Sequence, residues 1–218
     1  VTLGIFTAFI VIIFLGYSGF TSFMNLNQDV AISTAKMTHK ILVMELENER
    51  NSLVKSANLV SKTHSYRKAV QENNIAYLQN EIIPNVTNSD LDIFFITDKN
   101  GKIIVDKNNP NRRGEKTGLN GLIQKAIINN QNIYGFEIIS KNDLLREKSA
   151  LYEKVKMNKK ATQDSKEGFK VKDVEENGLA NIVIEPILSP DSSTVIGSVV
   201  AASLINRDYK LVDKVKGD

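Results

Sequence analysis

Two adjacent arginines, Arg112 and Arg113, stand beside Gly114 in the sequence NNPNRRGEKTG, which is typical of a loop. Guanidinium groups bind carboxylates and phosphates through paired N–H donors, so two of them beside a sheet could clamp an anionic ligand. Arg67 and its neighbour Tyr66 belong to an earlier helical segment and could converge on the same region. The alternative is that the two loop arginines simply face water.

Three aromatic side chains on expected strands complete the candidate ligand-binding set. Tyr134 and Phe136 lie two residues apart and therefore share one face of a strand, and Phe95 lies on another strand. Aromatic residues on a sheet face fill a core more often than they line a pocket, so both interpretations stay open. Glu185, between apolar neighbours, must face water or find a partner.

Other chemistry finds little support in the sequence. The absence of cysteine excludes disulfides, thiol nucleophiles and cysteine-ligated metals. His39 and His64 are far apart and have no acidic partner at metal-ligand spacing. Glycine-rich phosphate loops, nucleophile elbows and H-E-x-x-H motifs are absent. We therefore expect no enzyme, cofactor or metal in this segment, and the net charge of +3 is too small to indicate nucleic-acid binding.

The first part of the chain predicts a transmembrane helix over residues 1–22. No charged residue precedes Asp29, and about 20 apolar residues at ~1.5 Å each cover a hydrocarbon core of ~30 Å. A secretory signal has a shorter apolar region followed by a small-residue cleavage site, which is missing here. We therefore expect a membrane anchor, and a chain that is a fragment because it begins with Val.

A long helix is expected over residues 23–83, because neither Gly nor Pro interrupts it before Pro84. Its apolar residues follow a helical period, among them Val30, Met37, Ile41 and Met44, while charges occupy the other faces. Such a helix has one or two apolar stripes that must pack against its own domain or a partner helix. It is therefore interpreted as a helix that packs against its own domain and also forms a homodimer.

Beyond Pro84 the apolar period changes to two, which predicts strands and an α+β fold over residues 84–218. The sequence FFITDKNGKIIVD predicts a hairpin that turns at Lys99–Gly101. A charged stretch, residues 141–177, is expected to be a helical, solvated insertion, with a lid over a pocket as the alternative. The elements expected are strands at 91–97, 102–106, 132–140, 179–188 and 194–205, and helices at 119–129 and 207–216.

The segments ITDKNGKIIVDKNNPNRRGE and GLANIVIEPILSPDSSTVIGSVVAASLINRDYKLVDKV resemble Cache sensor domains, over about residues 1–216 when the preceding helices are included. The resemblance implies a single PAS-like antiparallel sheet of about five strands with flanking helices, a homodimer, and a small ligand such as an organic anion or amino acid. In similar domains the loop corresponding to Pro110–Gly114 flanks the ligand cavity, which implies a binding role for Arg112 and Arg113. The tryptophan of amino-acid-binding relatives is absent here, as is the covalent haem motif.

The resemblance implies the sensor segment of a methyl-accepting chemotaxis protein, held in the inner or plasma membrane with its sensor domain periplasmic or extracellular. It would bind a small molecule, an anion or carboxylate, and pass a conformational signal through the membrane. The alternatives are the sensor segment of a histidine kinase and a ligand-free structural or dimerisation spacer.

Overall fold

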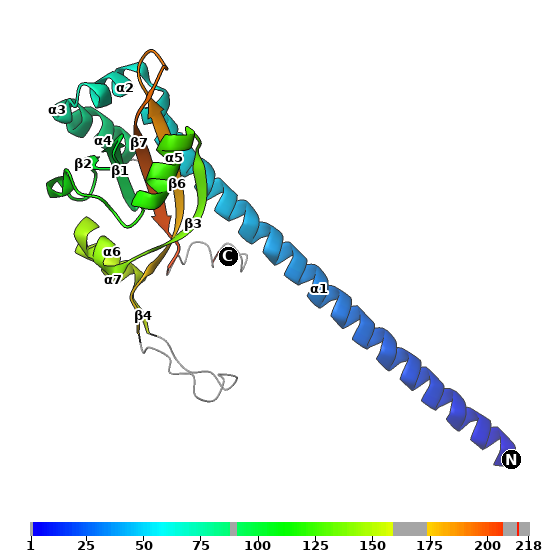
Figure 1. Cartoon of the computed structure of the whole chain (residues 1–218). Coiled ribbons are helices and arrows are strands. Elements are labelled where there is room, and N and C mark those ends of the chain that lie inside the picture. Colours follow the sequence, from blue (N-terminus) through cyan, green and yellow to red (C-terminus); the bar gives the residue numbers. More distant parts are fainter. Residues whose placement is uncertain (1, 88–90, 159–173, 207–212, 214–218) are drawn as a thin grey trace. The chain divides into compact units, whose positions relative to one another are not determined.

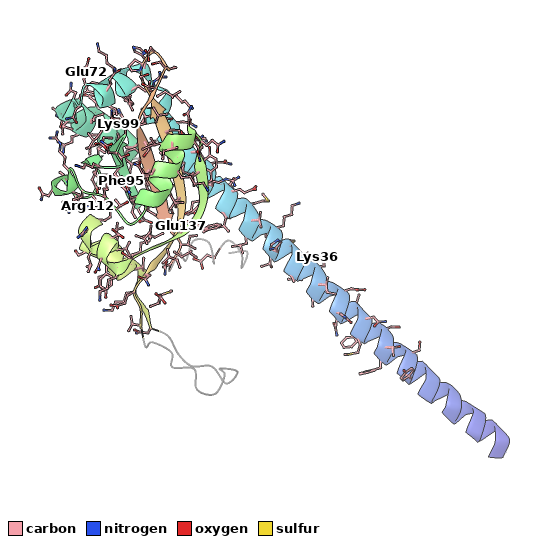
Figure 2. All side chains as sticks on the ribbon, in the orientation of Figure 1. Lys36, Glu72, Phe95, Lys99, Arg112 and Glu137 are labelled. Atoms are coloured by element: carbon pink, nitrogen blue, oxygen red, sulfur yellow. The ribbon has the colours of Figure 1, made fainter. Side chains whose placement is uncertain are left out.

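The computed structural model describes residues 2–87, 91–158, 174–206 and 213, with side chains from residue 17 onward (Figures 1 and 2). Residues 46–209 form one compact unit, and the helical residues up to Glu45 belong to a second. The two units are described separately here.

The first helix, α1, runs from Thr2 to Lys62 without a break, as expected for a stretch in which Gly and Pro are absent after Gly19. In the part of α1 up to Glu45, four large apolar side chains recur every seven residues and are exposed by about half or more. They are Phe23 (60%), Val30 (56%), Met37 (64%) and Met44 (52%). A seven-residue apolar repeat is the pattern of a helix that pairs with another helix.

The predicted membrane span, residues 1–22, falls mainly on residues 1–16, whose side chains lie outside the described part of the chain. Among the residues that are described, no helix combines the length and the apolar character that crossing a membrane requires.

The segment expected as one helix over 23–83 is helical but divided. Thr63 adopts an extended conformation (φ −80°, ψ 121°) and separates α1 from α2, His64–Gln71. A turn at Asn73, with φ +52°, then leads into three short helices. These are α3, Ile75–Tyr77; the π-helix η1, Leu78–Ile82; and α4, Ile83–Thr87.

A five-stranded antiparallel sheet follows, and it confirms the expected α+β class (Figure 1). The strand order is β2-β1-β7-β6-β3, so the last two strands of the chain occupy the middle. The bounds are β1, Ile93–Asp98; β2, Ile103–Asp106; β3, Ile133–Ile139; β6, Gly178–Leu188; and β7, Val195–Leu204. All five lie within three residues of their expected positions.

Two glycines meet requirements that other residues would not. The β1–β2 hairpin turns at Gly101, whose φ is +75°, as the Lys-Asn-Gly sequence predicts. Where β7 crosses β1, a Cβ on Gly197 would lie 2.0 Å from the Thr97 carbonyl oxygen. The two strands therefore approach one another more closely than any side chain allows.

Helices cover both faces of the sheet. On one face, called here the α1 face, Val183, Ile187 and Val199 pack against Leu53, Ala57 and Val60 of α1 and against the short helices after it. On the other, called the α5 face, Ile182 and Ile184 pack against α5, Asn120–Asn129, and against α6 and α7. Neighbouring residues of β6 thus point to opposite faces, as the period of a strand requires.

The charged stretch begins with two helices, α6, Lys141–Glu147, and α7, Ser149–Val155, that cover part of the α5 face. A small pair of strands follows, β4, Met157–Asn158, and β5, Val174–Glu175. The rest of the expected insertion, residues 159–173, lies outside the described residues, as does the expected closing helix at 207–216 except residue 213.

Candidate ligand-binding site

A cavity of about 240 Å³ lies on the α5 face, between β1, the loop after β2, the end of β3 and α6. Its volume is just below the range of roughly 300–1,000 Å³ common for small-molecule sites, so it suits a small ligand. The lining is mostly apolar, with a few polar and charged groups. The residues that matter for recognition are the aromatic Phe95 and the polar or charged Arg112, Thr117, Ser140, Asp143 and Glu147.

The loop after β2 is shaped by a carboxylate and an amide that cap its turns. Asp106 Oδ1 accepts hydrogen bonds from the backbone N–H groups of Asn108 (2.8 Å) and Asn109 (3.1 Å). The Asn109 side chain then accepts from Asn111 N at 3.1 Å, at the start of the 3-10 helix η2, Pro110–Arg112. Asp and Asn favour such local turns, and here the turns bring the Arg112 side chain to the cavity on the α5 face.

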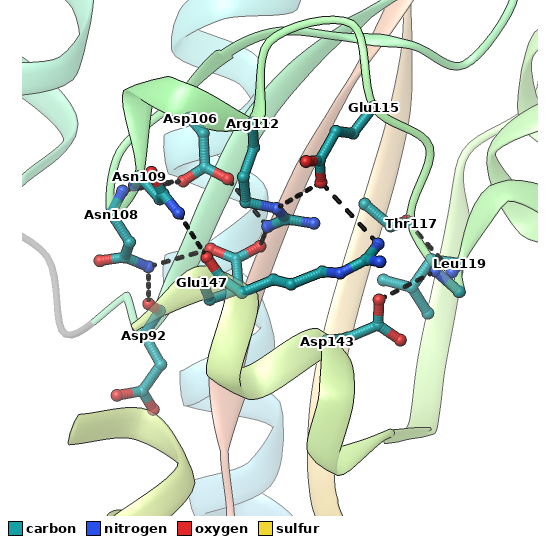
Figure 3. Close-up of polar contacts among 12 residues, drawn as sticks. Asp92, Asp106, Asn108, Asn109, Arg112, Glu115, Thr117, Leu119, Asp143 and Glu147 are labelled. Atoms are coloured by element: carbon teal, nitrogen blue, oxygen red, sulfur yellow. Dashed lines mark hydrogen bonds and ion pairs between the residues drawn. The ribbon is translucent and has the colours of Figure 1, made fainter. Parts of the chain in front are cut away.

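Arg112 is buried, with 2% of its surface exposed, and lies at the centre of an ionic cluster (Figure 3). Its Nη1 donates to Asp106 Oδ2 at 2.9 Å and also to Glu147 Oε1. Both carboxylates are nearly fully buried, and Glu115 Oε2 lies 3.6 Å from Arg112 Nε. The guanidinium carbon is 6.0 Å from the centre of the Phe95 ring. Arg112 therefore already serves two carboxylates of its own chain.

One guanidinium does not neutralise this cluster. Burial, together with the nearby charge of Asp106, raises the pKa of Glu147 to about 7 despite the opposing effect of Arg112. Burial likewise raises the pKa of Asp106, against the hydrogen bonds from Asn108 and Asn109 and the charge of Arg112. The carboxylates around Arg112 thus outnumber the guanidinium that pairs with them, and their ionised forms are costly to bury.

Asp143, one turn before Glu147 on α6, is the second carboxylate that lines the cavity. Ser140 caps α6 by accepting from Asp143 N (3.1 Å), and its hydroxyl donates to Asp143 Oδ2 at 2.7 Å. Gly118 N lies 3.4 Å from Asp143 Oδ1, and a Cβ on Gly118 would approach Oδ2 to 2.6 Å. Both partners are neutral, so they orient this carboxylate without cancelling its charge.

The structure brings only two of the seven predicted site residues, Arg112 and Phe95, to this cavity. Arg113 is exposed and lines a separate groove of about 420 Å³, together with Lys99 and Lys102 of the β1–β2 hairpin. The two arginines therefore do not form a single clamp, because consecutive residues at the end of η2 point to different sides.

Arg67 and Tyr66 lie in α2 and line neither cavity. Arg67 Nε donates to Leu188 O at 3.0 Å, and its Nη2 donates to Ser189 O and to Ser192 Oγ (2.8 Å), so it holds the β6–β7 turn. The Tyr66 hydroxyl accepts from Asn85 Nδ2 at 3.2 Å.

Tyr134 and Phe136 are also outside the cavity. Their side chains are 45% and 52% exposed on β3, an edge strand. They pair with Val183 and Asn181 of β6, which places them at the margin of the α1 face. They neither fill the core nor line this pocket.

Three carboxylates of the site were not among the predicted residues: Asp106, Asp143 and Glu147. Asp106 ends a predicted strand, where functional side chains often lie, and this was the one available signal. Asp143 and Glu147 belong to a stretch that is rich in charge and resembles a solvated loop. Within the described part of the chain, no group of three or more potential metal ligands has the geometry to hold an ion.

A five-stranded antiparallel sheet, flanked by helices and with a cavity on one face, is the architecture that the resemblance to Cache sensor domains implies. The chain matches the family model dCache_3, described as the double sensory domain of two-component sensor kinase, over residues 34–218. The chain belongs to this family, which confirms the Cache resemblance. No curated protein matches the chain.

Proposed function

We propose that this chain is the extracytoplasmic segment of a membrane-anchored signalling protein and that it binds a small molecule in the cavity beside Arg112. The observation that carries the proposal is a cavity in a sensory domain, lined by buried ionisable groups and apolar side chains. Buried charges are costly unless they are paired or await a ligand, so clusters of this kind gather at functional sites.

The sheet offers a route from the cavity to α1. Ile182 and Ile184 of β6 belong to the core on the cavity side, whereas Val183 packs on the α1 face. A ligand that moves β1 or α6 would therefore also shift the strands on which the end of α1 rests. To signal, it must bind one arrangement more tightly than the other.

Three polar contacts tie α1 to the central strands and support this route. Asn181 Nδ2 donates to Leu46 O at 3.4 Å, and Ser203 Oγ donates to Glu49. Ser61 Oγ donates to Glu185 Oε2 at 2.8 Å, and burial raises the pKa of Glu185. Contacts of this kind have directional preferences, so a small displacement of α1 would break some and keep others.

The family description favours a two-component kinase as the output of the parent protein, and a chemotaxis output stays a prediction from the sequence. Membrane anchoring through residues 1–22 and a homodimer joined along α1 are part of the proposal. Arg112 already binds two carboxylates of its own chain. An anionic ligand, as the sequence predicts, is therefore proposed only for the groove beside Arg113, which is also lined by Lys99 and Lys102.

The test is a thermal-shift screen of the 218-residue chain against small amines, carboxylates, alcohols and amino acids. A ligand present at 100 times its Kd should stabilise the fold by ~2.7 kcal/mol, or roughly 5–10 °C. Thr117→Trp fills the cavity from its loop wall and should abolish the shift. Gln131→Trp places the same side chain at an exposed position after α5 and should keep it.

A shift that survives in Thr117→Trp would move the ligand to another site. A chain that gives no shift with any compound would instead act as a ligand-free spacer, and the proposed function would be wrong.

A further inference from the structure

We propose that the cavity takes a small organic cation, a protonated amine attached to an apolar body. This inference rests on the proposed function, since it names the ligand class of the same site. The two neighbouring arginines predicted an anionic ligand. The cation is inferred instead from the charged side chains that line the cavity.

The first step is the balance of charge. Two basic side chains, Arg112 and Arg146, lie within ion-pair distance of the acidic groups around the cavity. Of the charged residues, two carboxylates, Asp143 and Glu147, line the cavity beside one guanidinium, Arg112. Asp106 and Glu115 lie within ion-pair distance of Arg112 and add to the acidic side of the balance around it. Arg146 is mostly exposed and its contact with Glu115 is long, at 3.9 Å, so the balance inside the wall is more acidic still.

The second step is the placement of the two carboxylates that line the cavity. Asp143 and Glu147 are one turn apart on α6, so their carboxylates lie on the same side of that helix and both line the cavity. The hydrogen-bond donors to Asp143 are a hydroxyl and a backbone amide. An ammonium group has three donors and a full positive charge, and it can satisfy two such carboxylates at once.

The third step concerns the rest of the ligand. Ile93, Phe95 and Leu119 form apolar walls, and the Phe95 ring already lies near one cation, Arg112. Aromatic faces attract cations and apolar walls bury a hydrocarbon body, so an alkyl or aryl amine matches both parts of the lining. A carboxylate of the same shape would meet the negative charges of Asp143 and Glu147, and because Arg112 Nη1 is bonded to Asp106 and Glu147, only the rest of that guanidinium would remain for it.

Proton release provides a signature of binding at this particular wall. Glu147 has a pKa of about 7, so it is partly protonated at neutral pH. A cation bound beside it favours the ionised form and should expel protons. Calorimetry in two buffers of different ionisation enthalpy measures that release directly.

The experiment compares matched ligands on the 218-residue chain at pH 7: benzylamine, benzoate and benzyl alcohol, and n-butylamine, n-butyrate and 1-butanol. We expect each amine to bind at least tenfold more tightly than its carboxylate and alcohol counterparts. Asp143→Asn and Glu147→Gln should each weaken amine binding at least tenfold. Glu147→Gln should also remove proton release, whereas Glu153→Gln, a change at an exposed carboxylate of α7, should alter neither.

Gly118→Ala gives a second test that leaves every charge in place. Its Cβ would displace the Asp143 carboxylate, so amine binding should weaken although the net charge is unchanged.

Tighter binding of the carboxylates, with loss of that binding in Thr117→Trp, would overturn the cation inference and leave the proposed function standing. Amine binding that none of the cavity variants changes would also overturn the inference, because the amines would then bind elsewhere. If none of the six compounds binds, the cation inference is wrong, and the broader screen decides the proposed function.

Discussion

Arg112 has two roles: it stabilises the domain and it lines the cavity. It joins the end of β2 to α6 through Asp106 and Glu147, and these bonds hold the two sides of the cavity together. Removing one partner of a buried ion pair leaves the other charges without compensation, which is costly.

Arg112→Ala should therefore destabilise the fold by about 3 kcal/mol at pH 7, equivalent to a melting temperature lower by roughly 6–12 °C. Urea unfolding at pH 7 and pH 5 measures the effect. The loss of stability should be smaller at pH 5, where Asp106 and Glu147, now without Arg112, take up protons. Arg113→Ala, at the exposed neighbouring position, should stay within about 0.5 kcal/mol of the parent. Equal effects of the two changes would contradict the ionic cluster.

Glu147 predicts a pH dependence with a definite sign. Its pKa is about 7 in the folded chain against 4.5 for the unperturbed side chain, so the folded state binds more protons between these values. This contribution to stability is full below pH 4.5 and is lost as the pH rises towards 7, by at most about 1.4 kcal/mol per unit. Glu147→Gln should flatten the fall, leaving the smaller part that arises from the raised pKa of Asp106. Denaturant unfolding from pH 4.5 to 8 tests this, and an unchanged slope would refute it.

The partners of Arg112 explain why its burial in an ionic cluster could not be predicted from the sequence. Asp106 lies six residues before it and Glu147 thirty-five after it. Nothing local distinguishes a guanidinium that faces water from one that a distant helix covers. Burial and pairing depend on the tertiary fold, so only Arg112 and Phe95 of the seven predicted residues lie at the cavity, and the carboxylates beside them were not predicted.

At the scale of elements, α2 is attached to the β6–β7 turn by one side chain. Arg67→Ala should remove the hydrogen bonds to Leu188, Ser189 and Ser192 and cost about 1–3 kcal/mol. Hydrogen exchange of the turn amides should become faster, while Lys68→Ala, its exposed neighbour, should leave them unchanged. Ligand binding should persist in Arg67→Ala; its loss would restore Arg67 to the ligand-binding site.

The strands were predictable because their signals are local. The Lys-Asn-Gly tip and the alternating residues of β1 and β2 specify a hairpin by themselves, and the SPDSS turn does the same for β6 and β7. The break after Lys62 was not predictable, because Thr63 has no intrinsic tendency strong enough to end a helix. There the packing of α2 on the core outweighs local preference.

At the scale of the molecule, the apolar repeat on α1 predicts a homodimer. Met37→Lys combined with Met44→Lys places two charges in the seven-residue repeat and should convert a dimer into a monomer. Light scattering after size-exclusion chromatography measures the mass. Ala35→Lys with His39→Lys puts the same charges on the opposite side of the helix and should leave the dimer intact. A parent chain that is already monomeric would exclude this interface.

The order of the strands also determines when the domain can fold. The hairpin β1–β2 and the strand β3 have no pairing with each other, because β7 and β6 lie between them. Ile93 pairs with Ala202, so the sheet cannot close until nearly all of the described chain has been made. Contacts so distant in sequence form slowly. A nascent chain with this topology cannot complete its sheet until late in synthesis, and this would keep the proposed extracytoplasmic segment unfolded long enough to cross a membrane before it folds.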